Sequence, residues 1–399
     1  MGMFRRFLSQ GFQAAVAGLG VVASLHGSAA PITPGNIVVF RAGSGTNALS
    51  STTGNDVILD ERTTSGSLVQ SIAITATGAG TKLINAGAAT AEGALSISPD
   101  GRWITFGGYN TTVGGAVSLP TSSSASIPRS IGIFDTTSGN FALTTAGTFY
   151  NAGAVRTAYS SDGNKFWAAG SNTGIIYGTV DNSSGVIVNG TGAGTNNRVL
   201  GQYGSDLYVS SASGTLPTVG LLGGNPLAGA VPTSSIALPN IPRQGGSPAT
   251  SRYGFVFLDV NPAVPGIDTM YTVDDSLTSG GLWKYSLGLS GTWTGMGSIT
   301  GTSSTTKLVG LTGGVSGNDV QLFMTGNGNS LYSFIDANAA TSTLSGGTSS
   351  LTTIATAATN TAFRGVVLVP VPEPTALALV GVAGGAGLML VRSRQRRRR

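Results

Sequence analysis

Few residues in this sequence could do chemistry, and their types exclude several reaction classes. The chain contains no cysteine and a single histidine, His26, close to the N-terminus. Serine and cysteine catalytic triads, and zinc sites built on imidazole or thiolate, require those residue types. Glutamate is also scarce, because only Glu61 and Glu92 precede Glu373. A carboxylate pair that cleaves a polysaccharide could still be assembled from aspartates, but no sequence pattern selects one. We therefore expect a protein that is not an enzyme.

The densest acidic group in the sequence surrounds a turn-forming segment at residues 261–267. Its members are Asp259, Asp268, Asp274 and Asp275. Carboxylate oxygens on a loop between strands would suit calcium, which prefers oxygen ligands. Their spacing differs from that of an EF-hand loop, and aspartate side chains commonly cap turns at strand ends. We expect turn capping here, with calcium binding as the weaker alternative and no other cofactor.

The elements that must position these residues are β-strands. Short runs of β-branched and aromatic residues recur along the chain, separated by Gly, Pro, Asp and Asn. No long stretch of the body has a helical period of apolar residues. Residues 94–106 and 157–168 repeat one pattern, in which an Asp-Gly pair, Asp100-Gly101 or Asp162-Gly163, separates two apolar runs. The pattern is typical of hairpins in an all-β protein.

The hairpins group into units of four strands with a period of about 55 residues, which is typical of propeller blades. The last apolar run, residues 363–369, has no room for partners after it, whereas the first runs lack an inner strand. Joining the two ends would complete one blade and remove exposed strand edges. The sequence predicts a single propeller of about six blades over residues 31–370, with seven as the alternative and a β-sandwich or β-helix as the competing fold. The first strands of the units are expected to begin near residues 94, 157, 198, 253, 308 and 363.

Six aromatic residues could serve either ligand binding or packing. Exposed on loops, they would stack on sugar rings, whereas buried they would pack one blade against the next. Strand alternation places Trp283 and Tyr285 on the same face, which favours packing. The six residues are Trp103, Tyr109, Trp167, Trp283, Tyr285 and Trp293.

The basic character of the chain is confined to its ends. Two of the 21 Lys and Arg precede residue 31 and six follow residue 391, so 13 remain in the body against 15 acidic residues. The net charge of +5 therefore comes from the two ends. Without a basic stripe to neutralise phosphates, the body is not expected to bind nucleic acid.

Residues 1–30 have the pattern of a secretory signal peptide. Arg5 and Arg6 form a positive start, residues 11–25 are mostly apolar, and Ser28-Ala29-Ala30 offers small residues at a cleavage position. We expect export by the general secretion machinery and cleavage by signal peptidase after Ala29 or Ala30.

The other end of the chain combines a rigid tripeptide, an apolar segment and a basic cluster. Pro372-Glu373-Pro374 precedes residues 375–391, which carry no charge. Seventeen residues span about 26 Å as a helix, near the lower limit for crossing a bilayer of about 30 Å. The positive-inside rule would hold the following arginines in the cytoplasm and the body outside the inner membrane. These arginines are Arg392, Arg394, Arg396, Arg397, Arg398 and Arg399.

Residues 371–399 thereby resemble the PEP-CTERM sorting signal of Gram-negative bacteria, with an ordinary single-pass anchor as the alternative. The resemblance implies that a membrane-embedded exosortase recognises Pro372, Glu373 and Pro374, cleaves nearby, and sorts the protein to the outer surface or the extracellular space. Bacteria with this system commonly make exopolysaccharide. The blade motifs resemble bacterial surface propeller repeats only in a general way, so no function is carried over from them.

These expectations combine into an exported cell-surface or extracellular-matrix protein whose non-catalytic propeller binds polysaccharide or protein. An extracellular polysaccharide hydrolase or lyase that uses aspartates in the propeller channel is one alternative. A structural component of the envelope is another. The expected partners are exosortase, signal peptidase, the secretion machinery and, before processing, the inner membrane, with exopolysaccharide as a candidate ligand. No ligand-binding residue of the body can be named from the sequence.

Overall fold

The computed structural model describes most of the chain between residues 29 and 372. The predicted signal peptide, except for Ala29 and Ala30, lies outside the described residues, as do Glu373, Pro374, the apolar segment 375–391 and the C-terminal arginines. Within the described part, no helix is long and apolar enough to cross a membrane. The description covers residues 29–372 except 51–52, 75–80, 116–117, 146–148, 181, 190–194, 213–217, 223–234, 239–240, 242–250, 277–279, 301–306 and 327–328.

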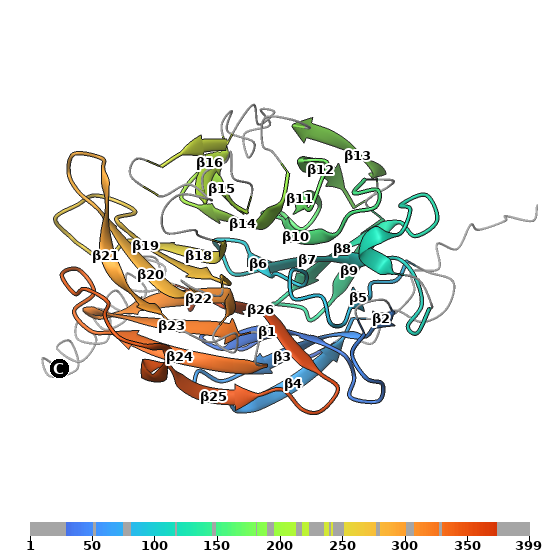
Figure 1. Ribbon diagram of the computed structural model, residues 1–399, viewed down its shortest axis with the longest axis horizontal. Coiled ribbons are helices and arrows are strands. Elements are labelled where there is room, and N and C mark those ends of the chain that lie inside the picture. Colours follow the sequence, from blue (N-terminus) through green and yellow to red (C-terminus); the bar gives the residue numbers. More distant parts are fainter. Residues whose placement is uncertain are drawn as a thin grey trace, which may run out of the picture.

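The fold is a β-propeller of six four-stranded antiparallel sheets arranged around a central axis (Figure 1). Six blades are observed, as predicted, and not the alternative seven. Each blade is given from its inner to its outer strand. The first three blades are β26 (Ala362–Leu368), β1 (Ile37–Ala42), β3 (Val57–Arg62) and β4 (Leu68–Ala73); β6 (Ser96–Ile97), β7 (Trp103–Tyr109), β8 (Arg129–Asp135) and β9 (Phe141–Thr145); and β10 (Val155–Tyr159), β11 (Lys165–Gly170), β12 (Ile175–Thr179) and β13 (Asn182–Asn189).

The other three blades follow in chain order. They are β14 (Asn197–Tyr203), β15 (Asp206–Ser211), β16 (Val219–Leu222) and β17 (Ser235–Ala237); β18 (Arg252–Leu258), β19 (Thr269–Asp274), β20 (Gly281–Leu287) and β21 (Trp293–Thr300); and β22 (Leu308–Ser316), β23 (Asp319–Gly326), β24 (Ser330–Asp336) and β25 (Thr352–Thr356). Short accessory elements are the strand pair β2 (Gly54–Asn55) and β5 (Asn85–Ala86), and the 3-10 helices η1 (Leu119–Thr121) and η4 (Thr348–Ser350).

The two ends of the propeller sequence complete one blade together, as the sequence predicted. Strand β26 pairs antiparallel with β1, from Ile37 opposite Leu368 to Ala42 opposite Ala362. Strand β1 also pairs with β3, so the C-terminal strand is the innermost member of the blade that begins the chain. The ring is thereby closed, and no inner strand is left without its blade.

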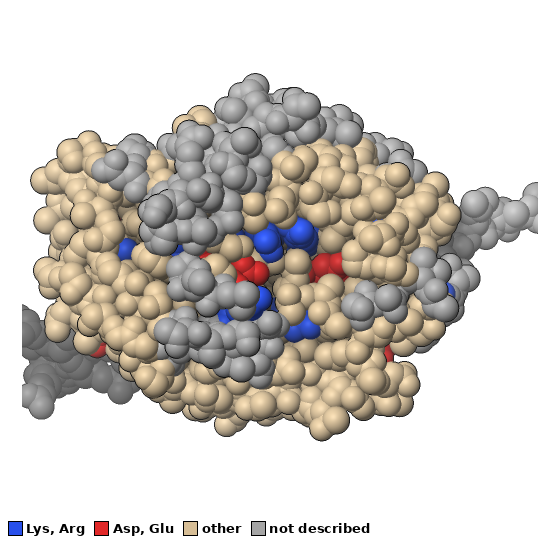
Figure 2. Space-filling view, in the orientation of Figure 1, with Lys and Arg blue, Asp and Glu red and all other residues tan. Residues whose placement is uncertain are grey.

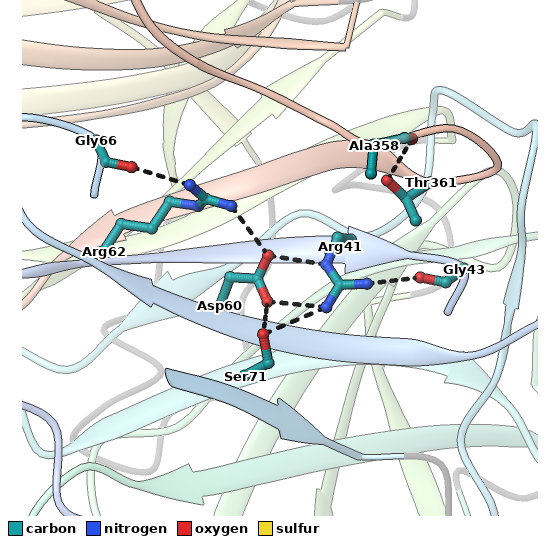
Figure 3. Close-up of polar contacts among 8 residues, drawn as sticks. All are labelled: Arg41, Gly43, Asp60, Arg62, Gly66, Ser71, Ala358 and Thr361. Atoms are coloured by element: carbon teal, nitrogen blue, oxygen red, sulfur yellow. Dashed lines mark hydrogen bonds and ion pairs between the residues drawn. The ribbon is translucent and has the colours of Figure 1, made fainter. Parts of the chain in front are cut away.

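The closing blade is further tied by a buried carboxylate on β3 (Figure 3). Asp60 accepts two hydrogen bonds from Arg41 of β1, with Nε at 2.8 Å and Nη2 at 3.0 Å, and one from Ser71 Oγ of β4 at 2.6 Å. Arg62 approaches the same carboxylate at 3.5 Å. A forked arginine–carboxylate contact is directional as well as charged. It therefore fixes the lateral order of three of the four strands.

Turns between the inner two strands form as their residue types predict. Gly101 and Gly163 have φ values of +75° and +77°, a region that favours glycine. Asp100 Oδ1 accepts a hydrogen bond from the backbone N–H of Arg102, and Asp162 Oδ1 accepts one from that of Lys165. Both Asp-Gly pairs are therefore turn residues.

The aromatic residues weighed in the sequence pack within and between blades. Tyr109, Trp167, Tyr285 and Trp293 are buried, and Trp103 and Trp283 are half-buried. The packing interpretation is thus confirmed for these six side chains. An exposed aromatic platform for sugars does not arise from them.

A buried ion pair joins the last two blades. Lys284 of β20 and Asp336 of β24 are 1% and 4% exposed, and Lys284 Nζ lies 2.7 Å from Asp336 Oδ2. The ammonium group also donates to the backbone oxygens of Ala339 and Ser342 and to Ser342 Oγ. Tyr271 Oη donates to the same Asp336 oxygen at 2.5 Å. Both charges are thereby compensated inside the protein, as buried charges must be.

Candidate functional site: the central channel

The inner strands of the propeller surround a channel along the axis, and its wider part is a cavity of about 690 Å³. We call this cavity the lower cavity. It is lined by β6, by the C-terminal parts of β14, β18, β22 and β26 and, at its rim, by Pro370 and Val371, whereas β10 contributes no residue. Hydrophobic side chains dominate the lining, with polar groups such as Gln202 and Ser98 among them. A recess of this size and character is typical of small-ligand sites.

The channel narrows towards its other end. Leu95, Val199 and Leu311 line both the lower cavity and a second void of about 20 Å³ above it. That volume is about enough for one water molecule. The three residues therefore lie at a constriction between the lower cavity and the opposite mouth of the channel.

The opposite mouth is rich in charge. Four inner strands each contribute one arginine near their N-terminal ends, and carboxylates lie among these arginines. In Figure 2, basic and acidic side chains gather around the centre of the face that is seen. We define the arginine mouth as Arg156, Arg198, Arg252 and Arg364 together with Glu92, Asp274 and Asp275.

Two of these arginines are anchored by backbone oxygens. Arg364 donates from Nη1 to Phe363 O at 3.0 Å and from Nη2 to Gly87 O at 2.7 Å. Arg156 donates from Nη1 to Asn196 Oδ1 and, at 3.3 Å, to Asn197 O. In both guanidinium groups the buried Nε has no hydrogen-bond partner among the described residues. These contacts position the charge but leave donor capacity unused.

The other two arginines lie over aromatic rings. Arg252 stacks over Trp283 at 4.2 Å, donates from Nη2 to Tyr285 Oη at 3.2 Å, and has its Nη1 3.4 Å from Asp274 Oδ2. Arg198 stacks over Tyr253 at 4.0 Å. Such stacking holds a guanidinium group flat without using its N–H donors.

Burial changes the acid–base properties of the mouth. Desolvation, followed by repulsion from Arg156, lowers the pKa of Arg198 to about 10. Desolvation lowers the pKa of Arg364 to about 10 as well, against an opposing effect of Glu92. Both values lie far above neutral pH, so both side chains keep their positive charge.

Glu92 is the buried acid of the arginine mouth. It accepts hydrogen bonds from Tyr109 Oη at 2.6 Å and Asn85 Nδ2 at 3.2 Å, and it interacts electrostatically with Arg156 and Arg364. Desolvation outweighs these contacts and raises the pKa of Glu92 to about 7. Its negative charge is therefore only partly present near neutral pH.

The structure does not bring the four aspartates of the predicted acidic group together. Asp268 and Asp274 flank or end the six-residue strand β19, which at about 3.3 Å per residue holds them roughly 20 Å apart. Asp259 is exposed on the loop before Asp268, and Asp274 and Asp275 belong to the arginine mouth. Among the described residues, no three His, Cys, Asp or Glu side chains lie close enough to hold one metal ion. The weaker calcium alternative thus finds no site in these four residues.

Two of the four aspartates cap turns, as the stronger interpretation predicted. Asp268 accepts hydrogen bonds from the backbone N–H of Val260 and Asn261 and from Thr269 Oγ1. Asp274 accepts from the backbone N–H of Ser251 at 2.8 Å and of Ser276 at 2.8 Å. Their oxygens are occupied by the chain itself.

The sorting residues can be placed only in part. Pro372 is exposed at the end of the described chain, just beyond the rim of the lower cavity. Glu373, Pro374 and the C-terminal arginines, Arg392, Arg394 and Arg396 to Arg399, lie outside the described residues.

The sequence interpretation missed the arginine mouth, although a signal was present. Four of the inner strands, β10, β14, β18 and β26, have an arginine among their first three residues. Aligning the predicted inner strands would have shown this recurrence at one level of the ring. It was missed because the four residues are far apart in the chain.

The fold and channel define a six-bladed β-propeller with one recessed, charged mouth. Comparisons with known proteins support the propeller fold and nothing more specific. No protein-family model matches the chain, and no curated protein matches it either.

Several solved structures are similar in fold. A chain of a nidogen/laminin complex is 13% identical over 84% of this chain and 98% of its own length, with a TM-score of 0.45. TolB from Acinetobacter baumannii is 13% identical over 84% of this chain and 67% of its own length, with a TM-score of 0.42. The periplasmic gluconolactonase PpgL of Pseudomonas aeruginosa is 15% identical over 75% of this chain and 78% of its own length, with a TM-score of 0.39. These distant likenesses carry no conclusion about what this chain binds or does.

Proposed function

We propose that the protein is exported, sorted by an exosortase at residues 371–399, and acts outside the cell as a non-catalytic propeller that binds polysaccharide or protein. The observation that carries the binding role is the recessed channel, with an apolar cavity of about 690 Å³ at one end and a charged mouth at the other. Export is supported by the signal-peptide pattern and by the complete Pro-Glu-Pro, apolar and arginine order in the sequence.

A polysaccharide-cleaving enzyme is the alternative function, and it would need two carboxyl groups placed together in the channel. Glu92 is the one carboxylate among the residues that line the two cavities, and the aspartates of the arginine mouth, Asp274 and Asp275, interact with Arg198. Hydrolysis of a glycosidic bond normally uses two carboxyl groups about 5 to 9.5 Å apart. No specific feature of the channel favours the other alternative, in which the protein is a purely structural component of the envelope.

The binding role predicts association without cleavage. The full chain, mixed with extracellular polysaccharide from the producing bacterium, is expected to bind while the length of the polysaccharide stays unchanged. Co-sedimentation measures the binding, and size-exclusion chromatography of the polysaccharide measures its length. Shortening of the polysaccharide would replace this proposal with an enzyme, and absence of binding would redirect the search to a protein partner.

The sorting role predicts retention of an altered chain. Replacing Glu373 with alanine removes the charged centre of the tripeptide, so the exosortase should no longer recognise the segment. We expect an uncleaved protein that accumulates in the inner-membrane fraction, measured by fractionation and immunoblotting. The matched control is Asp259→Ala, which removes an exposed carboxylate from a loop of the propeller and leaves the C-terminal segment intact. Normal release of the Glu373→Ala protein would contradict exosortase sorting.

A further inference from the structure

The arginine mouth concentrates positive charge at one level of the ring. Arg156, Arg198, Arg252 and Arg364 come from four different blades. They are linked electrostatically through shared carboxylates, because Arg156 and Arg364 both interact with Glu92 and Arg198 interacts with Asp274 and Asp275. Four guanidinium groups face three carboxylates, which leaves one positive charge in excess, or two when Glu92 is protonated.

The donors of these arginines are not all used by the protein. Arg252 and Arg364 are 1% and 4% exposed, and the Nε of each has no hydrogen-bond partner among the described residues. The Nη1 of Arg252 likewise makes no hydrogen bond, although it is near Asp274. Leaving buried charged donors unpaired is costly, so native structures normally supply an acceptor.

Arg198 has the most available guanidinium group of the four. Among the described residues its side chain makes no hydrogen bond or ion pair, and its Cζ lies 4.0 Å from the centre of the Tyr253 ring. It is only partly buried, as is Arg156, so both can be reached from solvent. A planar guanidinium group with free N–H donors matches the two oxygens of a carboxylate.

We propose that the arginine mouth is an oxyanion-binding site that takes the carboxylate of an acidic saccharide. The carboxylate accepts hydrogen bonds from Arg198 and Arg156 at the surface of the mouth, while Arg252 and Arg364 add positive charge from below. The saccharide assignment rests on the proposed function, which supplies extracellular polysaccharide as ligand, whereas the oxyanion site rests on the arginines alone.

The test is calorimetric titration of the full chain with glucuronate, with glucose as the neutral counterpart. We expect glucuronate to bind and glucose not to bind. Replacing Arg198 by glutamine should weaken glucuronate binding at least about tenfold, because one charge-assisted, forked contact is lost. The fold should be kept, since Arg198 makes no described hydrogen bond.

The matched control is Arg102→Gln. Arg102 is about half exposed and pairs with Asp135 beside the Asp100-Gly101 turn, at the opposite end of the inner strands. The Arg102→Gln substitution removes one positive charge, as Arg198→Gln does. Both variants keep the C-terminal arginines, so any anion binding by these arginines is equal in the two proteins. Glucuronate affinity should be unchanged in Arg102→Gln.

A second variant gives an effect of opposite sign. Glu92→Gln removes the carboxylate that competes for Arg156 and Arg364, keeps the side-chain shape, and retains one oxygen that can accept a hydrogen bond from Tyr109 or Asn85. At pH 8, where Glu92 is mostly ionised in the parent protein, glucuronate should bind several-fold more tightly to this variant.

The outcomes separate the site from the proposed function. Equal binding of glucose and glucuronate, or unchanged affinity in Arg198→Gln, would overturn the site even if polysaccharide still bound to the chain. Tighter binding of inorganic phosphate than of glucuronate, lost in Arg198→Gln, would overturn the saccharide assignment. Arg198-dependent glucuronate binding would support the site even if the bacterium's own polysaccharide did not bind.

Discussion

Replacing Lys284 by alanine is expected to lower the free energy of unfolding by about 3–5 kcal/mol, because it leaves Asp336 buried without its positive partner. The carboxylate would keep only hydrogen bonds from Tyr271 Oη and Ser342 Oγ. The backbone oxygens of Ala339 and Ser342 would also lose their donor. Urea unfolding followed by tryptophan fluorescence measures the change.

The control for this prediction is Lys165→Ala. Lys165 is exposed at the start of β11, and an exposed lysine contributes within about 0.5 kcal/mol. A Lys284→Ala protein as stable as Lys165→Ala would show that the buried pair is not needed. The double variant Lys284→Met with Asp336→Leu should recover much of the loss, since it removes both charges at once.

Removing the innermost strand of the closing blade is expected to abolish the folded state. A chain that stops after Thr361 lacks β26, whose Phe363, Val366 and Val367 are at most 4% exposed. Burying each such side chain contributes about 1.5–3 kcal/mol, and the whole domain is stable by only about 5–15 kcal/mol. The loss also leaves the inner edge of β1 unpaired.

The comparison is with a chain that stops after Pro372 and keeps β26. Far-ultraviolet circular dichroism and limited proteolysis should show a folded, resistant protein in the longer chain and a degraded or aggregated one in the shorter. Equal protease resistance of the two chains would mean that five complete blades and an open sixth suffice.

The fold could be predicted closely from local signals. The inner strands were expected near residues 94, 157, 198, 253, 308 and 363, and they begin at residues 96, 155, 197, 252, 308 and 362. Apolar runs and Asp-Gly turns are local features, so a single sequence displays them. The closure followed from counting strands, because one blade lacked an inner strand and the last run lacked partners.

The candidate site depends on long-range geometry, which local patterns do not contain. Asp268 and Asp274 are near one another in sequence but are separated by the length of β19, so one caps a loop and the other faces Arg252. Arg156 and Arg364 are distant in sequence, yet both interact with Glu92 because their inner strands meet around the axis. Proximity in sequence wrongly suggested that the two aspartates lie together, and distance in sequence hid the fact that the two arginines do.

The position of β26 determines how the molecule would bear a mechanical load. A pull on the chain beyond Pro372 acts along β26, whose hydrogen bonds to β1 run across the strand direction from Leu368 opposite Ile37 to Ala362 opposite Ala42. The force therefore shears these bonds together instead of opening them one after another. Tension at the C-terminal end would pass through β1 into the rest of its blade, so a propeller held at this end would resist flow as a closed ring.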